Sequence, residues 1–252
     1  MPEGTCVRPL AAAAERLIVA LDVATASEAK RLVQAIGPGP GYKIGKQLFV
    51  AEGPGLVREL TGSGRRVFLD LKFHDIPNTV AGAVRSAAEL GVSMLTVHAC
   101  GGRRMLEAAV EAAGKAGSPP LVLAVTVLTS LGEADLGEIG VPVGLTEQVI
   151  RLARLAQQAG CGGVVASPRE TAELRRELGA EMVLVTPGVR PAGSASGDQA
   201  RTATPGEAIR AGADYIVVGR PITGAPDPGE AARAVVVEIT RAAEGRSLVV
   251  PA

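Results

Sequence analysis

The stretch FLDLKFHDIPNT, residues 68–79, carries Asp70, Lys72, His74 and Asp75. Its apolar start is typical of a buried β-strand. Successive strand residues point to opposite faces, so Asp70 and Lys72 share a face with Phe68. Burying two charges is costly unless they are well paired. The stretch therefore indicates either a structural ion pair or a functional site at the carboxyl end of a strand.

Two earlier strand candidates carry further charged residues. ALDV delivers Asp22 after an apolar run, and YKIGKQLF, residues 42–49, places Lys43 at its start with Gly45 and Gln47 on the same face. Taken singly, Asp22 could be a turn or helix-capping residue and Lys43 could be solvated. Together with the third strand they supply two carboxylates and two ammonium groups.

The histidines and cysteines lie in no motif for nucleophilic or metal chemistry. We interpret His74 and His98 as structural, because neither has a Ser, Cys or metal-ligand partner in a recognisable pattern. Cys6, Cys100 and Cys161 have neither CxxC spacing nor an activating motif. Scattered cysteines of this kind fit a reducing cytosol. We therefore predict a cytoplasmic protein with no metal site and no cofactor.

Composition argues against several classes of partner. Lys plus Arg and Asp plus Glu each number 26, so no net charge attracts nucleic acid or anionic membranes. Aromatic residues make up 2% of the chain and Trp is absent, which disfavours a stacking platform for single-stranded nucleic acid. The amino terminus does not resemble a signal peptide, and no apolar run approaches the roughly 18 residues of a membrane span. We expect a soluble, unprocessed protein.

One pattern recurs along the chain: a β-branched apolar run, a turn, and an Ala- and Leu-rich stretch with helical periodicity. Eight strand candidates occupy residues 16–23, 42–49, 66–73, 94–100, 121–128, 162–167, 181–188 and 215–221. This alternation predicts one (β/α)₈ TIM-barrel domain over residues 1–252, with a core of about 16–245 and active-site groups at the carboxyl ends of the strands. A doubly wound open sheet is the alternative, although no GxGxxG follows the first strand.

The connection over residues 191–205, PAGSASGDQARTATP, is long and lacks apolar periodicity. Such loops within a compact domain are usually functional lids or disordered segments. We interpret this one as a lid, because it joins the seventh strand to the next helix on the expected active face.

Seven motifs in order, ALDV, YKIG, FLDLKFHDIPNT, VLTS, VTPGVR, DQAR and VVGRPIT, closely resemble the bacterial-type orotidine 5′-phosphate decarboxylase family, from residue 16 to about 222. The resemblance implies a carboxy-lyase of de novo pyrimidine biosynthesis that converts orotidine 5′-phosphate to uridine 5′-phosphate and CO₂ without a metal or cofactor.

The same resemblance implies roles for individual residues. Lys72 would deliver a proton to C6 of the pyrimidine, and Asp70 would lie beside the departing carboxylate. Lys43 and Asp75 would complete an alternating array, with Asp75 and Thr79 entering the neighbouring subunit's site in a homodimer. The implied substrate-binding positions are Asp22, Lys43, Asp75, Thr79, Thr129, Ser130, Pro187, Arg190, Gln199, Gly219 and Arg220. Barrel phosphate sites form after strands 7 and 8, where Arg190 and Arg220 offer fork-shaped cations.

Two alternatives remain. Metal-dependent 3-keto-gulonate-phosphate decarboxylases and hexulose-phosphate synthases share Asp-x-Lys-x-x-Asp, but they place a magnesium-binding carboxylate where this chain has Lys43, whose charge would repel a metal ion. The chain could also be a catalytically silent scaffold that binds uridine monophosphate without releasing CO₂.

Overall fold

The computed structural model describes residues 13–191 and 203–244. Most of the predicted lid, including Gln199, lies outside the described residues. Among the described helices, none combines the length and the apolar character needed to cross a membrane.

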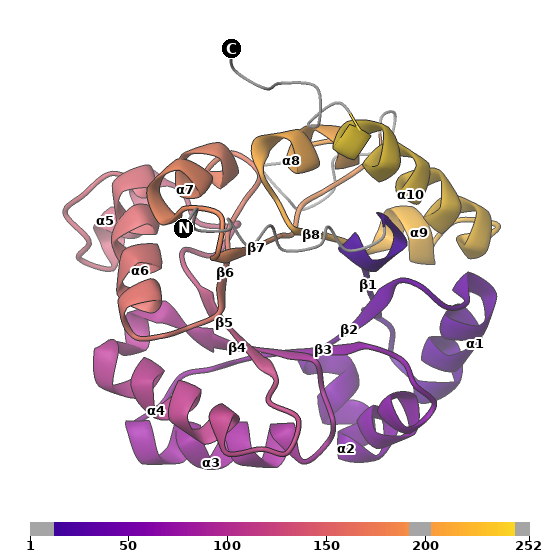
Figure 1. Cartoon of the computed structure of the whole chain (residues 1–252), viewed down its shortest axis with the longest axis horizontal. Coiled ribbons are helices and arrows are strands. Elements are labelled where there is room, and N and C mark those ends of the chain that lie inside the picture. Colours follow the sequence, from indigo (N-terminus) through magenta and orange to yellow (C-terminus); the bar gives the residue numbers. More distant parts are fainter. Residues whose placement is uncertain (1–12, 192–202, 245–252) are drawn as a thin grey trace, which may run out of the picture.

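Eight parallel strands pair in chain order and close into a barrel, in which the last strand pairs with the first (Figure 1). The strands are β1 (Leu17–Ala20), β2 (Gly41–Gly45), β3 (Val67–Phe73), β4 (Met94–His98), β5 (Leu121–Val125), β6 (Gly163–Val165), β7 (Val183–Thr186) and β8 (Tyr215–Val218). The predicted TIM barrel is confirmed, and the doubly wound alternative is wrong.

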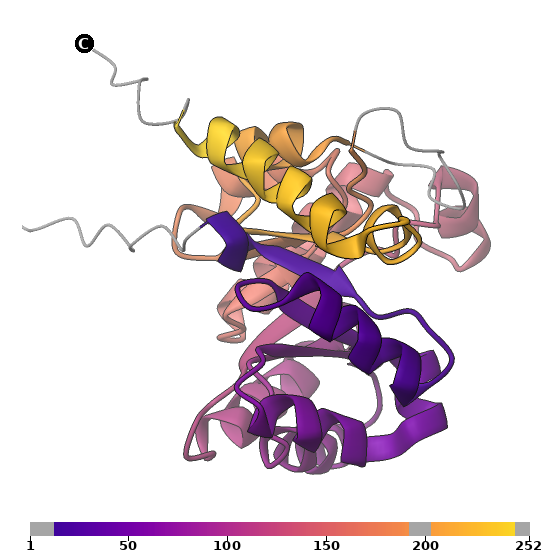
Figure 2. The same ribbon diagram turned by 90° about the vertical axis from the view of Figure 1, so that its right-hand side faces the viewer.

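Helices surround the strands on the outside of the barrel (Figure 1). They are α1 (Ala26–Ile36), α2 (Lys46–Gly62), α3 (Pro77–Ala88), α4 (Arg103–Gly114), α5 (Glu133–Glu138), α6 (Leu145–Gln158), α7 (Thr171–Leu178), α8 (Pro205–Ala211), α9 (Arg220–Thr223) and α10 (Pro228–Glu244), with short 3₁₀ turns η1 (Ala13–Arg16) and η2 (Ala99–Gly101). Helix α10 lies along the outside of the barrel and contacts α8 and α1 (Figure 2).

Local sequence accounts for several helix starts. The Thr25 hydroxyl accepts a hydrogen bond from the Glu28 N–H at the start of α1, and Thr204 and Glu207 form a reciprocal capping box at α8. Helix α3 begins with Pro77, whose missing N–H costs nothing in the first turn. These residues fix where α1, α3 and α8 begin after the loops that follow β1, β3 and β7.

The predicted strand over residues 42–49 is wrong in its second half. Strand β2 ends at Gly45, which is the N-cap of α2, so Lys46 and Gln47 are helical. Gln47 therefore does not continue the face of Lys43, which occupies the centre of the shorter strand. Strand β3 ends at Phe73 as predicted, whereas the remaining strands end two or three residues earlier than predicted. Apolar residues just beyond those ends, such as Leu21 and Val127, lie in loops but still pack in the core.

The core consists of two layers separated by the strand walls. Inside the barrel, Phe68 packs with small aliphatic residues such as Ala20 and Val217. Outside it, alternate residues such as Val19 and Leu69 face the helices. The alternation along β1 and β3 follows the two-residue period of a strand. The inner layer fills the barrel and forms a floor beneath its carboxyl end.

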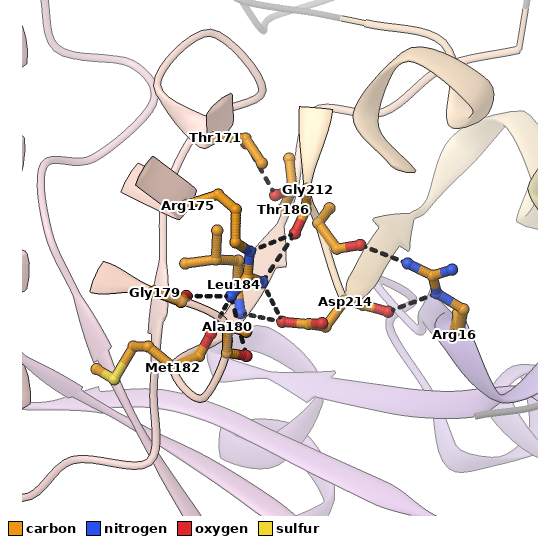
Figure 3. Close-up of polar contacts among 11 residues, drawn as sticks. Arg16, Thr171, Arg175, Gly179, Ala180, Met182, Leu184, Thr186, Gly212 and Asp214 are labelled. Carbon is orange, nitrogen blue, oxygen red and sulfur yellow. Dashed lines mark hydrogen bonds and ion pairs between the residues drawn. The ribbon is translucent and has the colours of Figure 1, made fainter. Parts of the chain in front are cut away.

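A network around Arg175 ties together the amino ends of β7 and β8 (Figure 3). The Arg175 guanidinium donates to the carbonyl oxygens of Gly179, Ala180, Met182 and Gly212 and to Asp214 Oδ2, the last at 2.6 Å. Asp214 Oδ2 also accepts from the Leu184 N–H at 2.8 Å. Arg16, just before β1, donates to the carbonyl oxygens of Ala213 and Asp214. The two arginines thus close the barrel at the end opposite the strand exits.

We expect Arg175→Met to lower the free energy of unfolding by about 2–4 kcal/mol, because it removes the charged donor to Asp214 and the guanidinium donor to several loop carbonyls. Urea denaturation of both proteins measures the change. The matched control is Arg176→Met on the same helix. The Arg176 side chain is 71% exposed, so loss of its ion pair with Glu173 should cost under about 1 kcal/mol. Equal stability of the two variants would contradict a closing role for Arg175.

Candidate functional site

A cavity of about 460 Å³ opens at the carboxyl ends of the strands. Inner-layer residues, among them Ala20, Phe68 and Val217, form its floor. Charged and polar side chains predicted from the sequence surround it, namely Asp22, Lys43, Asp70, Lys72, Thr129, Ser130, Arg190 and Arg220, together with Pro187 and Gly219. Residues from both halves of the chain therefore meet in one pocket with an apolar base and a charged wall.

The Asp70 carboxylate and the Lys72 ammonium form a close pair on β3. Lys72 Nζ lies 2.8 Å from both carboxylate oxygens of Asp70. Only 13% of the Asp70 side chain and 24% of the Lys72 side chain are exposed. The prediction that both side chains point into the barrel is confirmed, and each charge has its compensation within the cavity wall.

Lys43 links this pair to the end of β1. Its Nζ lies 2.9 Å from Asp22 Oδ1 and 3.8 Å from Asp70 Oδ2. A Cβ atom at Gly45 would come within 3.1 Å of Lys43 Nζ and 3.3 Å of Asp22 Oδ1, so the glycine leaves the space that this contact occupies. Three strands thus deliver two carboxylates and two ammonium groups in the order Asp22, Lys43, Asp70, Lys72.

Opposing effects act on the ionisation of Asp70. Burial raises the pKa of Asp70. The charges of Lys72 and Lys43 and the hydrogen bonds from Lys72 and Thr96 lower it, and together they outweigh the effect of burial. The net result is a pKa below the ordinary value for Asp. Asp70 is therefore ionised throughout the neutral range and acts as a fixed negative charge beside Lys72.

The remaining nucleophilic and basic side chains are poorly placed for catalysis. The His98 ring is tilted by 52° against that of His74, with the ring centroids 5.6 Å apart. Burial, together with neighbouring positive charge, lowers the pKa of His98. Burial raises the pKa of Cys100 and takes that of Cys161 to about 12. Within residues 13–191 and 203–244, no three His, Cys, Asp or Glu side chains are grouped in a way that could hold a metal ion.

Two arginines from the last two strand exits also line the cavity. Arg190 follows β7, and its N–H donates to the Ala203 carbonyl at 2.9 Å, where Val189 and Ala203 form an isolated parallel bridge. Arg220 is the first residue of α9, directly after Gly219 at the exit of β8. Both line the cavity, in the position where barrels bind phosphate groups.

Two predicted residues do not reach this cavity within one chain. Asp75 and Thr79 are both exposed and are not among the residues that line the pocket. Asp75 Oδ1 accepts a hydrogen bond from the N–H of Ile76, whose side chain is 67% exposed. These residues lie on the outer surface, at the start of α3.

Sequence reasoning missed Thr96, a fully buried residue of β4 that contacts both members of the β3 pair. The signal was available in the alternation of MLTVH. Leu95 and Val97 belong to the outer core and Met94 to the inner one, so Thr96 faces the barrel interior. A polar residue on the inner face of the strand next to β3 was therefore a candidate site residue, but the sequence interpretation considered only the charged motifs.

The chain is similar in sequence and in structure to known proteins over most of its length. A family model described as orotidine 5′-phosphate decarboxylase / HUMPS family matches residues 15–235. A Moorella thermoacetica protein named orotidine 5′-phosphate decarboxylase is 54% identical over 90% of this chain and 93% of its own length. One from Halorhodospira halophila with the same name is 56% identical, over 90% and 97%. The crystal structure of orotidine 5′-phosphate decarboxylase from Lactobacillus acidophilus superposes with a TM-score of 0.81 at 38% identity, covering 89% of this chain and 99% of that one.

The lowered pKa of Asp70 predicts a pH effect on stability. Between its folded pKa and its ordinary value near about 4, the unfolded chain binds more protons at Asp70, so the free energy of unfolding rises with pH in this window. We expect Lys72→Met to make this rise smaller, because it removes the largest attractive charge on Asp70. Urea denaturation at a series of acidic pH values measures it.

The control for this experiment is Lys30→Met, whose partner Glu59 is on the surface and half exposed. Its pH profile should follow that of the unmodified protein. Identical profiles for Lys72→Met and the unmodified protein would show that Lys72 does not set the ionisation of Asp70.

Proposed function

The chain belongs to the orotidine 5′-phosphate decarboxylase / HUMPS family and is a carboxy-lyase, and from this premise we propose that it converts orotidine 5′-phosphate to uridine 5′-phosphate and CO₂ without a metal ion, with Lys72 as proton donor. The relatives' names support decarboxylation in pyrimidine biosynthesis. The observation that carries the finer proposal is the Asp70 carboxylate held between Lys72 and Lys43 in one cavity.

The proposed reaction needs a cation where negative charge develops. When the bond between C6 and the carboxylate breaks, the electron pair stays on C6 and CO₂ leaves. The Lys72 ammonium stabilises that charge and then transfers a proton to C6, and the resulting amine regains a proton from water. Asp70 holds the Lys72 ammonium in position before substrate arrives, so little reorganisation is needed during the reaction.

Substrate binding follows from the distribution of groups around the cavity. Arg190 and Arg220 offer planar cations for bidentate bonds to the 5′-phosphate. The pyrimidine would lie near Thr129 and Ser130, over the apolar floor, and Asp22 and Lys43 would bind the ribose. Gln199 is proposed on the phosphate side as part of the lid, from the sequence resemblance alone.

The lysine on β2 argues against the metal-dependent relatives. Lys43 Nζ lies 3.8 Å from Asp70 and 2.9 Å from Asp22, so an ammonium group already neutralises the two carboxylates that a magnesium ion would need. A divalent cation at this position would be repelled by Lys43 and Lys72 together. We therefore propose chemistry without a metal or other cofactor.

A homodimer would explain why Asp75 and Thr79 are exposed. We propose that both residues enter the partner's cavity, where Asp75 would complete the alternating array of acids and lysines and Thr79 would help to hold the ribose. The exposed Ile76 beside them would then lie in an interface. We also propose a cytoplasmic protein, in keeping with Cys100 and Cys161, which are both free thiols.

The test of the proposed function is the loss of orotidine 5′-phosphate absorbance in excess EDTA. We expect steady conversion to uridine 5′-phosphate by the unmodified protein. Lys72→Ala should lose at least about 10³-fold in kcat, because proton transfer and electrostatic stabilisation each contribute factors of about that size. The variant should stay folded, because Lys43 and the Thr96 hydroxyl still compensate the Asp70 carboxylate and the truncation opens no aliphatic core.

Lys115→Ala, at the exposed C-cap of α4, is the control and should keep full activity. Near-normal turnover by Lys72→Ala would overturn the role of the lysine. Turnover of the unmodified protein only after metal is restored would favour the metal-dependent relatives. Nucleotide binding without CO₂ release would favour a silent scaffold.

Shared sites predict complementation between two inactive variants. Mixing Lys72→Ala with Asp75→Asn should restore up to about a quarter of full activity, because half of the randomly formed dimers carry both variants and each has one intact site. Activity after subunit exchange measures it, and native mass spectrometry verifies the exchange. Demonstrated exchange without recovery would contradict shared sites.

A further inference from the structure

The backbone at Lys72 has an unusual conformation. Its φ is +53°, and among the described residues it is the one non-glycine residue with positive φ. A side chain in the left-handed region costs conformational energy, and such residues persist only where surrounding contacts hold them. Lys72 is also the residue proposed to donate the proton, so the contacts that hold its backbone bear on where its ammonium group lies.

Strand β3 is distorted at the same place. Leu69 pairs with Leu95 and Phe73 with Val97, so four residues along β3 match two along β4. This irregularity is a β-bulge, which re-aims side chains and interrupts the backbone ladder. The N–H of Lys72 donates to Thr96 Oγ1 at 2.9 Å, so the side chain of Thr96 takes over as its acceptor.

The same hydroxyl also contacts the carboxylate of the catalytic pair. Thr96 Oγ1 donates to Asp70 Oδ1 at 2.9 Å. A hydroxyl carries one proton and accepts through its lone pairs, so the two bonds have fixed directions: from Lys72 N–H to Thr96, and from Thr96 to ionised Asp70. Thr96 is 0% exposed, so water does not compete for either bond.

We propose that Thr96 is a positioning residue for the decarboxylation, which holds Lys72 in the left-handed conformation and fixes the Asp70 carboxylate through one hydroxyl group. The proposal rests on the proposed function of Lys72. Thr96 acts from behind the pair and does not line the cavity. Its hydrogen bond also helps to lower the pKa of Asp70, which keeps the carboxylate charged beside Lys72.

A second buried threonine provides a comparison. Thr126, directly after β5, is 4% exposed, and its hydroxyl donates only to a backbone carbonyl, that of Val165, at 3.1 Å. It neither lines the cavity nor contacts Asp70 or Lys72 in the described contacts. Valine has nearly the same size as threonine, so either substitution removes one buried hydroxyl. Only Thr96→Val removes the link between the Lys72 backbone and the Asp70 carboxylate.

The experiment measures kcat and KM for orotidine 5′-phosphate with Thr96→Val, Thr96→Ser and Thr126→Val beside the unmodified protein and Lys72→Ala. We expect Thr96→Val to lose about 10- to 100-fold in kcat, as for hydrogen bonds to charged groups. KM should change by less than about threefold, since the phosphate contacts are remote. Thr96→Ser should return to within about threefold, and Thr126→Val should keep full kcat.

A crystal structure of Thr96→Val is the second measurement, and it does not depend on activity. We expect Lys72 to leave the left-handed region in that variant. Unchanged Lys72 geometry, wild-type kcat in Thr96→Val, or Thr96→Ser as poor as Thr96→Val would each overturn the proposal. If Thr96→Val does not fold, Thr96→Ala carries the same comparisons. Failure of both to fold, while Thr126→Val folds, would assign Thr96 to the fold and overturn a role in positioning.

A failure of the proposed function is distinguishable from a failure of this inference. An inactive unmodified protein, or an active Lys72→Ala, would refute the function of Lys72, while the Thr96→Val crystal structure would still decide whether Thr96 holds the backbone. An active unmodified protein with inactive Lys72→Ala and fully active Thr96→Val would refute the positioning role alone.

Discussion

The Asp70 carboxylate lies between two ammonium groups inside the mouth of the barrel, Lys72 at 2.8 Å and Lys43 at 3.8 Å. These charges are largely buried, and burial of an ion is strongly destabilising unless an opposite charge compensates it. Their mutual compensation requires that β2 and β3 lie side by side in one register and that both side chains point inward. The closed parallel barrel supplies that requirement, because it fixes each strand between two neighbours and leaves one face of every strand directed to the axis.

The two ends of the barrel carry different kinds of polar contact. At the amino ends, Arg175 and Arg16 bond mainly to backbone carbonyls, so their charges secure loops to one another. At the carboxyl ends, charged side chains face a cavity over the apolar floor that includes Phe68. Because closure of the barrel is secured at one end, the other can accept features that cost stability, among them a cluster of charges and a strand bulge.

Strand β3 carries both of these destabilising features, the charged pair and the bulge. Its first residues pair regularly with β2 and pack Leu69 against the helices, whereas its last residues depart from the ladder with β4. The buried hydroxyl of Thr96 lies at this irregularity and accepts the hydrogen bond from the Lys72 N–H. The local geometry of Lys72 is therefore a property of two strands together, and the charged pair depends on a neutral side chain that never reaches the cavity.

From the sequence alone, the repeating strand and helix pattern was enough to predict an eight-stranded barrel, and the two-residue period of FLDLKF placed Asp70 and Lys72 on its inner face. Those features are local, because the pleat of a strand and the periodicity of a helix follow from the chain's own geometry. The end of β2 at Gly45, the bulge in β3 and the two bonds of Thr96 were decided only by the tertiary structure. Each depends on register between segments distant in sequence, which no single stretch of residues encodes.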